Sequence, residues 1–331
     1  MHTITAIAHP NIALIKYWGK RDTVRNLPAT HSLSITLNTL ETHTCVNFSA
    51  ELSADQVYLN KALADDAFSA RVGACLDGFR TLAGVHTFAS VHTSNNFPTA
   101  AGLASSASGF AALLTAANAA LESPLNLRQL AILAREASGS AGRSLFGGYV
   151  IQHRGQHSDG SDSYAEALFP AKHWPLEVVI AITSEKEKNI GSTEGMLHTA
   201  ATAPYWRAWV DRSAADIQAA TAAIKQRDFA ALAEVAEASC LAMHALMQSA
   251  RPGLLYWNAA TIELIHKIRQ LRATGLAVFF TIDAGPQVKA VCLPEAADKV
   301  EAALKAVPGV LRTLRCLLGA GARISNDANT E

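Results

Sequence analysis

The chain has no excess of charge of either sign. Its 331 residues include 28 Lys and Arg residues, which balance 28 Asp and Glu residues. A protein without net charge has no broad positive field to attract nucleic acid or an anionic membrane surface. We therefore expect no nucleic acid and no membrane as partners, and any anionic ligand must be held by a local cluster of basic side chains.

Long apolar runs and paired cysteines are also missing. The longest apolar runs, around 176–183 and 276–282, have the length of strands, whereas a membrane helix needs about 20 residues. The N-terminal segment MHTITAIAHPNIALIKYWGK has no basic lead and has Pro-Asn where a signal peptide carries its apolar core. The five cysteines form an odd set without a CxxC pair, which argues against a disulfide framework and a zinc site. We expect a cytoplasmic protein.

Half of the residues are apolar, which is enough for a large core and two closely packed domains. Apolar and polar residues alternate in the first half, and this pattern predicts strands over 32–39, 42–48, 56–60, 87–93 and 149–153. Apolar residues at helical spacing predict helices over 67–82, 101–121 and 126–137.

The second half is dominated by Ala-rich helical patterns. We expect helices over 205–225, 229–249, 255–273 and 295–306, and strands over 176–183, 276–283, 287–293 and from 310. A polar, glycine-bearing loop at 153–164 precedes the strand at 176–183. We place a domain boundary near residue 180, which gives domains 1–180 and 181–331. The second resembles a helix-covered antiparallel sheet, and the fold class expected for the whole chain is α+β.

The most informative motif is PTAAGLASSASG at 98–109, between a predicted strand and a long helix. Small residues let a backbone approach a ligand closely, and a helix N-terminus offers free amide hydrogens and a partial positive charge. The hydroxyls of Ser105, Ser106 and Ser108 add hydrogen-bond donors, and the combination suits a triphosphate. On pattern alone, a helix packed tightly against a sheet explains the same composition. The Walker and GxGxxG patterns are absent.

Two short segments carry candidate anion-binding side chains. In KYWGK, Lys16 and Lys20 lie beside Tyr17, and such a set can neutralise and orient a diphosphate. The alternative is a solvated strand end with lysines facing water. In SGSAGRS, Ser138 and Ser140 precede Arg143, whose planar guanidinium can hold a carboxylate through two hydrogen bonds.

One acidic residue is placed where a catalytic base would be. Asp283 ends the apolar segment LAVFFTI and directly precedes Ala-Gly-Pro. A carboxylate at the mouth of a buried strand can act as a partly desolvated base, although an aspartate before Gly-Pro can also simply form a turn. His153 and His157 have the spacing of helical metal ligands, but Gly and Ser around them indicate an exposed loop without a third ligand.

The motif at 98–109 resembles the phosphate loop of the GHMP kinases, PxxxGLGSSA, with Ala104 in place of the second glycine. This version is typical of the diphosphomevalonate decarboxylase branch of that superfamily. The resemblance extends, in order, through 11–20 (NIALIKYWGK), 26–28 (NLP), 95–109, 138–148 (SGSAGRSLFGG), 191–196 (GSTEGM) and 283–286 (DAGP).

The resemblance implies a GHMP-kinase-like two-domain fold, with a mixed α/β ATP-binding N-terminal domain. It implies ATP-dependent decarboxylation of (R)-5-diphosphomevalonate to isopentenyl diphosphate, with ADP, phosphate and CO₂ released. The expected co-substrate is ATP with Mg²⁺, and the expected assembly is a homodimer. A phosphomevalonate decarboxylase, a mevalonate 3-kinase and a non-catalytic nucleotide-binding sensor on the same scaffold stay open as alternatives.

The resemblance also assigns roles to individual residues, without a protein ligand for a metal. The catalytic residues it implies are Asp283, Arg143 and Lys16. The substrate-binding residues it implies are Tyr17, Trp18, Gly19, Lys20, Arg71, Ser138, Gly139, Ser140, Ala141, Gly142, Arg143, Ser192 and Thr193. The nucleotide-binding residues it implies are Ser94, Ala101, Gly102, Ser105, Ser106, Ser108 and Lys188. Since three anionic groups must meet, Lys16, Lys20, Arg71 and Arg143 are expected to converge in one cleft.

Overall fold

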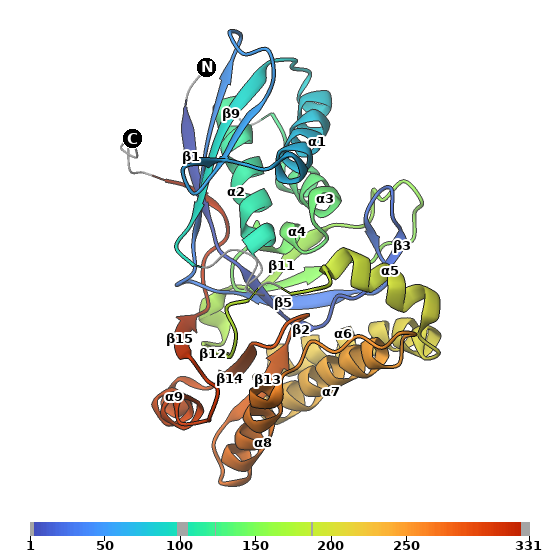
Figure 1. The fold of residues 1–331 in the computed structure, drawn as a ribbon, viewed down its shortest axis with the longest axis vertical. Helices are drawn as coiled ribbons and strands as arrows, with labels where there is room; N and C mark the ends of the chain where they lie inside the picture. Colours follow the sequence, from blue (N-terminus) through green and yellow to red (C-terminus); the bar gives the residue numbers. More distant parts are fainter. Residues whose placement is uncertain (1–2, 98–104, 123, 187, 326–331) are drawn as a thin grey trace.

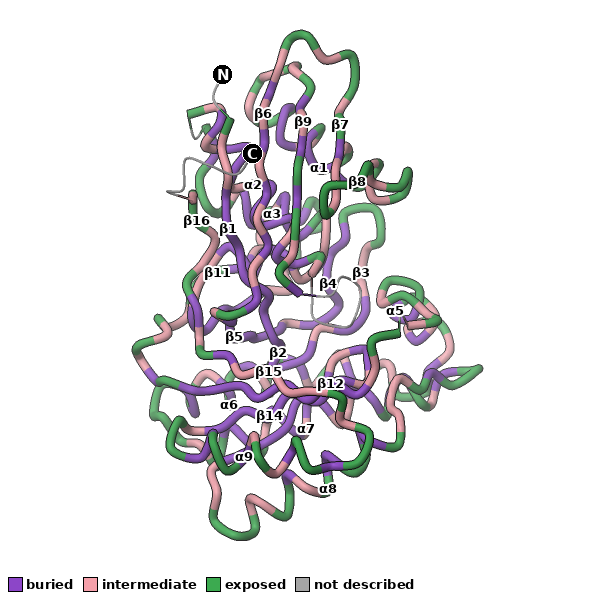
Figure 2. Tube along the Cα trace, turned by 60° about the vertical axis from the view of Figure 1, so that its left-hand side comes forward, coloured by how far each residue is buried: buried purple, intermediate pink, exposed green. Residues whose placement is uncertain are grey.

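The computed structural model describes residues 3–97, 105–122, 124–186 and 188–325. Three sheets follow one another along the long axis of the molecule, with helices packed between and around them (Figure 1). The buried segments run through the centre of the molecule from the first sheet to the third, and exposed residues lie mainly on the outer turns (Figure 2).

The first sheet contains six strands in the order β16-β1-β6-β9-β7-β8. Their bounds are β1 (Ile4–Ala8), β6 (Thr42–Ser49), β7 (Gln56–Leu59), β8 (Ala62–Leu63), β9 (Phe88–Asn95) and β16 (Arg323–Ile324). Alternate residues of β6 are buried, as expected for a strand with one face against the core. The core on that face is closed by α1 (Asp66–Ala83), α2 (Ser105–Ala120) and α3 (Leu127–Ala137).

The second sheet contains four strands in the order β11-β10-β5-β2, and a small hairpin extends from it. The bounds are β2 (Asn11–Ile15), β5 (Ser32–Thr36), β10 (Tyr149–Gln152), β11 (Ala165–Phe169) and, in the hairpin, β3 (Lys20–Asp22) and β4 (Leu27–Pro28). Every residue of β2, β5 and β10 is buried. Such strands are covered on both faces, here by α4 (Ala141–Ser144) and by the helices of the second half.

The third sheet has the order β13-β14-β12-β15, and all of its pairs are antiparallel. Its strands are β12 (Glu177–Ile182), β13 (Val278–Ile282), β14 (Val288–Cys292) and β15 (Arg312–Leu317). The helices of this half are α5 (Ser192–Thr202), α6 (Trp206–Gln226), α7 (Phe229–Gln248), α8 (Ala259–Ala273) and α9 (Ala297–Lys305). The expected α+β arrangement is therefore confirmed.

Helix α7 is the central helix of this half. By length and composition alone it could cross a membrane, but half of its apolar window is buried, and it packs against β2 and β13. It joins the second sheet to the third, which explains its apolar sequence without a bilayer.

The division between the sheets does not follow the expected boundary in the sequence. Residue 180 lies inside β12, and β12 pairs with β14 and β15 of the third sheet. At the other end of the chain, β16 returns to the first sheet and pairs with β1. A division at 180 would therefore cut a strand of the second half, and the last strand belongs with the first half.

Candidate active site

A cleft with a volume of about 900 Å³ lies where the first half faces the second. Its walls come from α1, α2, the first sheet, the β3–β4 hairpin, the segment after α3, α5 and the end of β13. Lys16, Lys20, Arg71 and Arg143 all line it. Their expected convergence in one cleft is confirmed.

Asp283 lies between two lysines at the inner end of this cleft. Lys16 Nζ is 2.6 Å from Asp283 Oδ1, and Lys289 Nζ is 3.1 Å from Asp283 Oδ2. Both lysine side chains are 1% exposed, whereas the aspartate side chain is 30% exposed. Each oxygen of the carboxylate thus has its own ammonium partner.

The two lysines change the expected acid–base character of Asp283. Burial by itself raises the pKa of this carboxyl, but the charges of Lys16 and Lys289 outweigh burial and hold the pKa well below its ordinary value of 3.8. A strongly basic carboxylate, as expected for a partly desolvated base, is therefore not what the structure shows. Asp283 is ionised at neutral pH and is suited to accept a hydrogen bond and orient a hydroxyl.

Arg143 is held rigidly at the cleft wall by residues of two strands. Arg143 belongs to α4. Its Nε donates to Asn11 Oδ1 of β2 at 3.0 Å, and its Nη1 donates to Ser32 Oγ of β5 at 2.6 Å. Burial lowers the pKa of Arg143 to about 10, so it stays protonated at neutral pH. A guanidinium has five N–H groups, and the two bonds leave N–H groups on both terminal nitrogens for a ligand.

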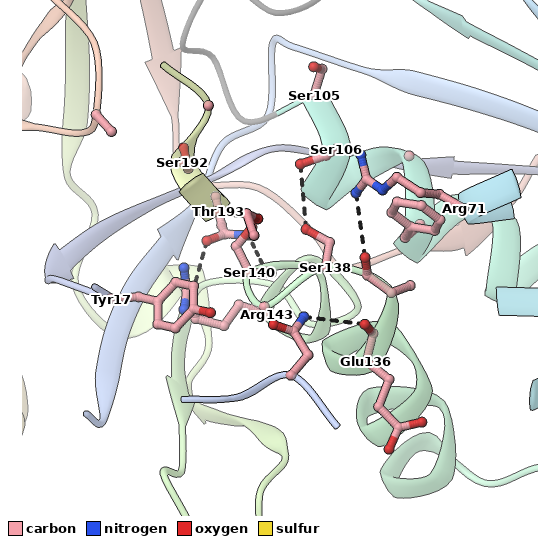
Figure 3. Close-up of a pocket in the computed structure, with 18 of the residues that line it drawn as sticks. Tyr17, Arg71, Ser105, Ser106, Glu136, Ser138, Ser140, Arg143, Ser192 and Thr193 are labelled. Atoms are coloured by element: carbon pink, nitrogen blue, oxygen red, sulfur yellow. Dashed lines mark hydrogen bonds between the residues drawn. The ribbon is translucent and has the colours of Figure 1, made fainter. Parts of the chain in front are cut away.

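Tyr17 presents a buried hydroxyl without a partner among the described residues. Burial raises the pKa of Tyr17 to about 12, so the hydroxyl stays protonated and can donate. A Cβ on Gly139 would lie 2.3 Å from that hydroxyl, so a glycine is required there. Buried polar groups are nearly always satisfied, and both residues line the cleft; the hydroxyl therefore fits a ligand oxygen. Figure 3 shows Tyr17 beside Arg143.

Trp18 and Gly19 differ in their relation to the cleft. Trp18 lines it. Gly19 has φ 94 and faces the ring of Trp206, which a Cβ would approach to 2.0 Å. Gly19 is thus needed for the turn that leads into the hairpin, and the structure does not place it at the cleft wall.

Lys20 and Arg71 also line the cleft, and because they are less buried than Lys16 and Arg143 they mark its entrance. Burial lowers the pKa of Lys20, and the nearby charge of Arg71 lowers it further. Arg71 Nη2 donates to Ala137 O at 3.4 Å, and its guanidinium lies 5.1 Å from the centre of the Phe110 ring. In the described part of the chain neither cation has an acidic partner within salt-bridge distance. Two neighbouring cations without a counterion favour an anionic ligand over a solvated helix surface.

The hairpin that carries Lys20 is anchored to the end of α3. Asn26 has φ 51, and its Nδ2 donates to Arg135 O at 2.6 Å and to Glu136 O at 3.2 Å. Arg135 is fully buried and donates to the carbonyls of Arg25 and Ser163. The hairpin and the segment that starts at Ser138 are therefore placed by the same helix end.

Part of the predicted nucleotide-binding set lies at the start of α2. Ser105 and Ser106 line the cleft, and Ser106 Oγ is 3.5 Å from Ser138 Oγ (Figure 3). Ala101 and Gly102 lie outside the described residues.

Two predicted nucleotide contacts are placed elsewhere. Ser108 is 0% exposed, and its hydroxyl bonds to Thr42 Oγ1 at 2.6 Å and to Ser105 O at 3.2 Å. It lies two residues beyond Ser106, on nearly the opposite face of the helix, and its hydroxyl meets Thr42 of β6 in the first sheet. Ser94 is exposed on β9, whereas its neighbours Thr93 and Asn95 line the cleft. The alternation of strand side chains explains the difference.

The remaining predicted residues line the cleft or lie just beneath its surface. Lys188 Nζ donates to Ser192 Oγ at 2.7 Å, and both line the cleft with Thr193. Ser138 and Ser140 also line it. Ala141 and Gly142 are buried beneath the surface instead, and a Cβ on Gly142 would lie 3.1 Å from Ala131 O.

Sequence reasoning missed Lys289, Asn11 and Ser32. Lys289 had a signal, since it is a lysine inside the otherwise apolar strand VKAVC. Asn11 and Ser32 had none, because an asparagine and a serine in strands are common. Their role follows only from the tertiary contact with Arg143.

The α+β fold places the N-terminus of α2, the hydroxyls of Ser105 and Ser106 and several cationic side chains in one cleft. This arrangement is that of a GHMP-type enzyme. Residues 8–165 match the Diphosphomevalonate decarboxylase-like N-terminal domain, and residues 178–317 match the Mevalonate 5-diphosphate decarboxylase C-terminal domain. The chain belongs to the diphosphomevalonate decarboxylase family. The expected enzyme class, an ATP-dependent decarboxylase, is thereby confirmed.

Individual relatives are similar over nearly the whole chain. The diphosphomevalonate decarboxylase mvd1 of Aspergillus fumigatus is 39% identical, and the match covers 93% of this chain and 81% of that protein. Mevalonate diphosphate decarboxylase from Staphylococcus aureus superposes with a TM-score of 0.92 at 33% identity, over 98% of both chains. A structure of MDDEF in complex with MVAPP, AMPPCP and magnesium gives a TM-score of 0.90 at 38% identity, over 98% of both chains.

Proposed function

We propose that this enzyme binds (R)-5-diphosphomevalonate and ATP in the cleft and converts them to isopentenyl diphosphate, ADP, phosphate and CO₂. The observation that carries the proposal is the convergence of Lys16, Lys20, Arg71 and Arg143 in one cleft that also contains Asp283, an ionised carboxylate paired with Lys16. The N-terminus of α2 also lines the cleft. The free amide hydrogens and partial positive charge at a helix N-terminus favour the binding of phosphate. The binding of MVAPP and AMPPCP by the related MDDEF supports two ligands in one site.

The reaction follows from leaving-group chemistry. The oxygen of the tertiary 3-hydroxyl attacks the γ-phosphorus of ATP, the bond from that phosphorus to the ADP oxygen breaks, and the hydroxyl proton passes to solvent water. Hydroxide is a poor leaving group, whereas the new phosphate departs readily with the C–O electrons. The C–C bond to the carboxylate then breaks, CO₂ leaves, and its electron pair forms the double bond at the electron-deficient carbon.

Asp283 and Lys16 would act at the hydroxyl. The carboxylate of Asp283 accepts a hydrogen bond from the 3-hydroxyl and directs an oxygen lone pair toward the γ-phosphorus. Lys16 lies 2.6 Å from the same carboxylate and lines the cleft. Its ammonium can therefore stabilise negative charge that develops on the transferring group.

Arg143 would bind the substrate carboxylate, and the residues at the entrance of the cleft would bind the substrate diphosphate. Arg143 is fixed by two hydrogen bonds, so its free N–H groups are oriented before substrate binds. Lys20, Arg71 and Tyr17 supply two charges and a hydroxyl donor for the diphosphate. Ser105, Ser106 and Lys188, which line the cleft, would contact the phosphates of the nucleotide.

The oxygen atoms that line the cleft are compatible with a magnesium ion whose ligands are mainly phosphate oxygens and water. Mg²⁺ usually keeps several waters and uses one or two protein oxygens besides substrate phosphates. The hydroxyls of Ser105 and Ser106 and the carboxylate of Glu136 line the cleft. Among the described residues no group of three or more His, Cys, Asp or Glu forms a dedicated cage. Magnesium would neutralise charge on the phosphates when bound.

A coupled assay tests the proposal. ADP and CO₂ are measured in the same reaction with diphosphomevalonate, phosphomevalonate and mevalonate as substrates. We expect equal release of both products and the highest kcat/KM with the diphosphate. ADP without CO₂ would indicate a kinase, and nucleotide binding without turnover would indicate a sensor. The cytoplasmic location and the homodimer expected from the sequence stay predictions, and sedimentation analysis tests the second.

A further inference from the structure

Lys289 is an ionisable side chain in a strand that otherwise belongs to the apolar core. All five residues of β14 are buried, and Lys289 is opposite Thr281 of β13 in the sheet. Directly opposed residues share a face, and Thr281 Oγ1 donates to Ala13 O of β2. Lys289 therefore faces the second sheet. An ammonium group in such a place is unfavourable unless a partner compensates it.

The compensating partner is the proposed catalytic carboxylate. Lys289 Nζ lies 3.1 Å from Asp283 Oδ2, on the oxygen that Lys16 does not contact. Lys16 is at the cleft wall, whereas Lys289 is not among the described residues that line the cleft. Lys289 thus supports Asp283 from behind. A carboxylate has about four lone-pair sites, so the two lysines leave capacity for a substrate hydroxyl.

Several charged or titratable groups surround Asp283 from different elements. They are Lys16 after β2, Lys289 of β14, Lys188 before α5, Arg143 of α4, and Cys240 and His244 of α7. Burial lowers the pKa of His244 to about 3, so it is neutral near neutral pH. Burial raises the pKa of Cys240 to about 11, so this thiol is also neutral. Among the described residues, Lys16 and Lys289 are the two cations within salt-bridge distance of the carboxylate.

We propose that Lys289 is a positioning residue, which holds the carboxylate of Asp283 ionised and in one orientation so that it can receive the hydrogen bond of the 3-hydroxyl. This inference rests on the proposed function, because it requires Asp283 to act at that hydroxyl. It assigns Lys289 no contact with substrate.

Removal of the Lys289 charge should change the pH dependence of turnover. In the native site the pKa of Asp283 lies well below 3.8 because two lysines oppose the effect of burial. Without Lys289, burial is opposed mainly by Lys16, and the pKa rises. The ionised form that accepts the hydrogen bond is then lost at a higher pH as the solution is acidified. The acid limb of kcat should therefore move to higher pH.

Three substitutions of Lys289 and one control separate charge from packing. Lys289→Met keeps the length of the side chain without charge, Lys289→Gln keeps a donor without charge, and Lys289→Arg keeps the charge. Thr281→Val is the control, since it changes the opposite residue on the same face and removes a hydrogen bond without removing charge. Each variant is purified as the full chain, its melting is followed by circular dichroism, and kcat and KM are measured from pH 9 down to the lowest pH at which the enzyme stays folded.

We expect Lys289→Met and Lys289→Gln to lower kcat by about 10- to 100-fold at neutral pH, with KM for diphosphomevalonate within about threefold. Their acid limbs should lie at higher pH than the native limb, and Lys289→Arg should restore part of kcat and of the native pH profile. Thr281→Val should lower the melting temperature without moving the limb. If Lys289→Met does not fold, the Gln and Arg variants carry the comparison.

Two outcomes would overturn the inference. One is a native pH profile and kcat in a folded, uncharged Lys289 variant, and the other is a Thr281→Val profile that moves as far as theirs. An Asp283→Asn variant distinguishes this failure from failure of the proposed function. If Asp283→Asn is inactive while Lys289→Gln resembles the native enzyme, only the role of Lys289 is wrong. If Asp283→Asn turns over normally, the role of Asp283 itself is wrong.

Discussion

Lys16 and Asp283 form an ion pair of 2.6 Å across 267 positions of the sequence. Lys16 follows β2 in the second sheet, and Asp283 follows β13 in the third. The backbone amide of Lys16 also donates to Ser239 Oγ of α7 at 3.0 Å. The proposed catalytic centre therefore exists only when the two halves are packed together. A substitution that weakens this packing should lower turnover more than it lowers the stability of either half.

Asp283→Asn should lower kcat by several orders of magnitude and leave ATP affinity nearly unchanged. The amide keeps the shape of the side chain but loses the negative charge that accepts the hydrogen bond of the hydroxyl and orients it. It also leaves Lys16 and Lys289 without their anion, so some loss of stability is expected. Single-turnover kinetics, nucleotide titration and thermal melting measure the three effects. Turnover close to that of the native enzyme would show that another group orients the hydroxyl.

Ser106 and Ser108 form a matched pair for the start of α2. Ser106→Ala should impair phosphoryl transfer by about 2–4 kcal/mol, if its hydroxyl stabilises the transferring group, with little change in stability. Ser108→Ala should instead destabilise the fold by about 1 kcal/mol, because it removes the bonds of a buried hydroxyl to Thr42 and to Ser105 O, while Thr42 keeps its bond to Asn95. Denaturant unfolding and kcat measured on both variants check this. Equal effects of both variants on kcat would argue against the distinction.

Lys20→Ala should act mainly on substrate binding. Because Lys20 lies near Arg71 at the entrance, its loss should raise KM for the diphosphate more than for the monophosphate, which makes fewer contacts there. Salt should weaken the difference, since both charges are partly exposed to solvent. Michaelis constants for both substrates at two ionic strengths are the measurement. An equal increase for both substrates would place the diphosphate elsewhere.

The sequence was sufficient for the long helices and for the convergence of cations. The helices expected over 205–225 and 229–249 are observed as Trp206–Gln226 and Phe229–Gln248, because their patterns are long and begin after clear turn signals. Strands Ile4–Ala8 and Asn11–Ile15 were not predicted, since they are short and interrupted by Pro10. Helix Ser192–Thr202 was missed because few of its residues are buried.

The electrostatic character of the site could not be predicted from local sequence. A strand-end aspartate suggested a raised basicity, but its pKa is set by Lys16 and Lys289, and the former is far away in the chain. The orientation of Ser108 likewise depends on which face of α2 meets the first sheet. Motifs identify the residues that gather at a site, and packing determines which of their atoms face the ligand.

Arg143→Lys should separate decarboxylation from phosphoryl transfer. Lysine keeps the positive charge, but it cannot maintain the bonds to Asn11 and Ser32 and still present a planar pair of N–H donors to the carboxylate. We expect CO₂ release to fall by at least about 100-fold, and ADP release to fall less because the hydroxyl and nucleotide groups are intact. Ser32→Ala is the matched control, since it removes one support of the guanidinium and should cause a smaller loss of the same kind. ADP and CO₂ are quantified in the same reaction for both variants. If Arg143→Lys decarboxylates as the native enzyme does, while Lys20→Ala depresses all substrates equally, the carboxylate and diphosphate sites have been exchanged, and the substrate lies in the cleft in the opposite orientation.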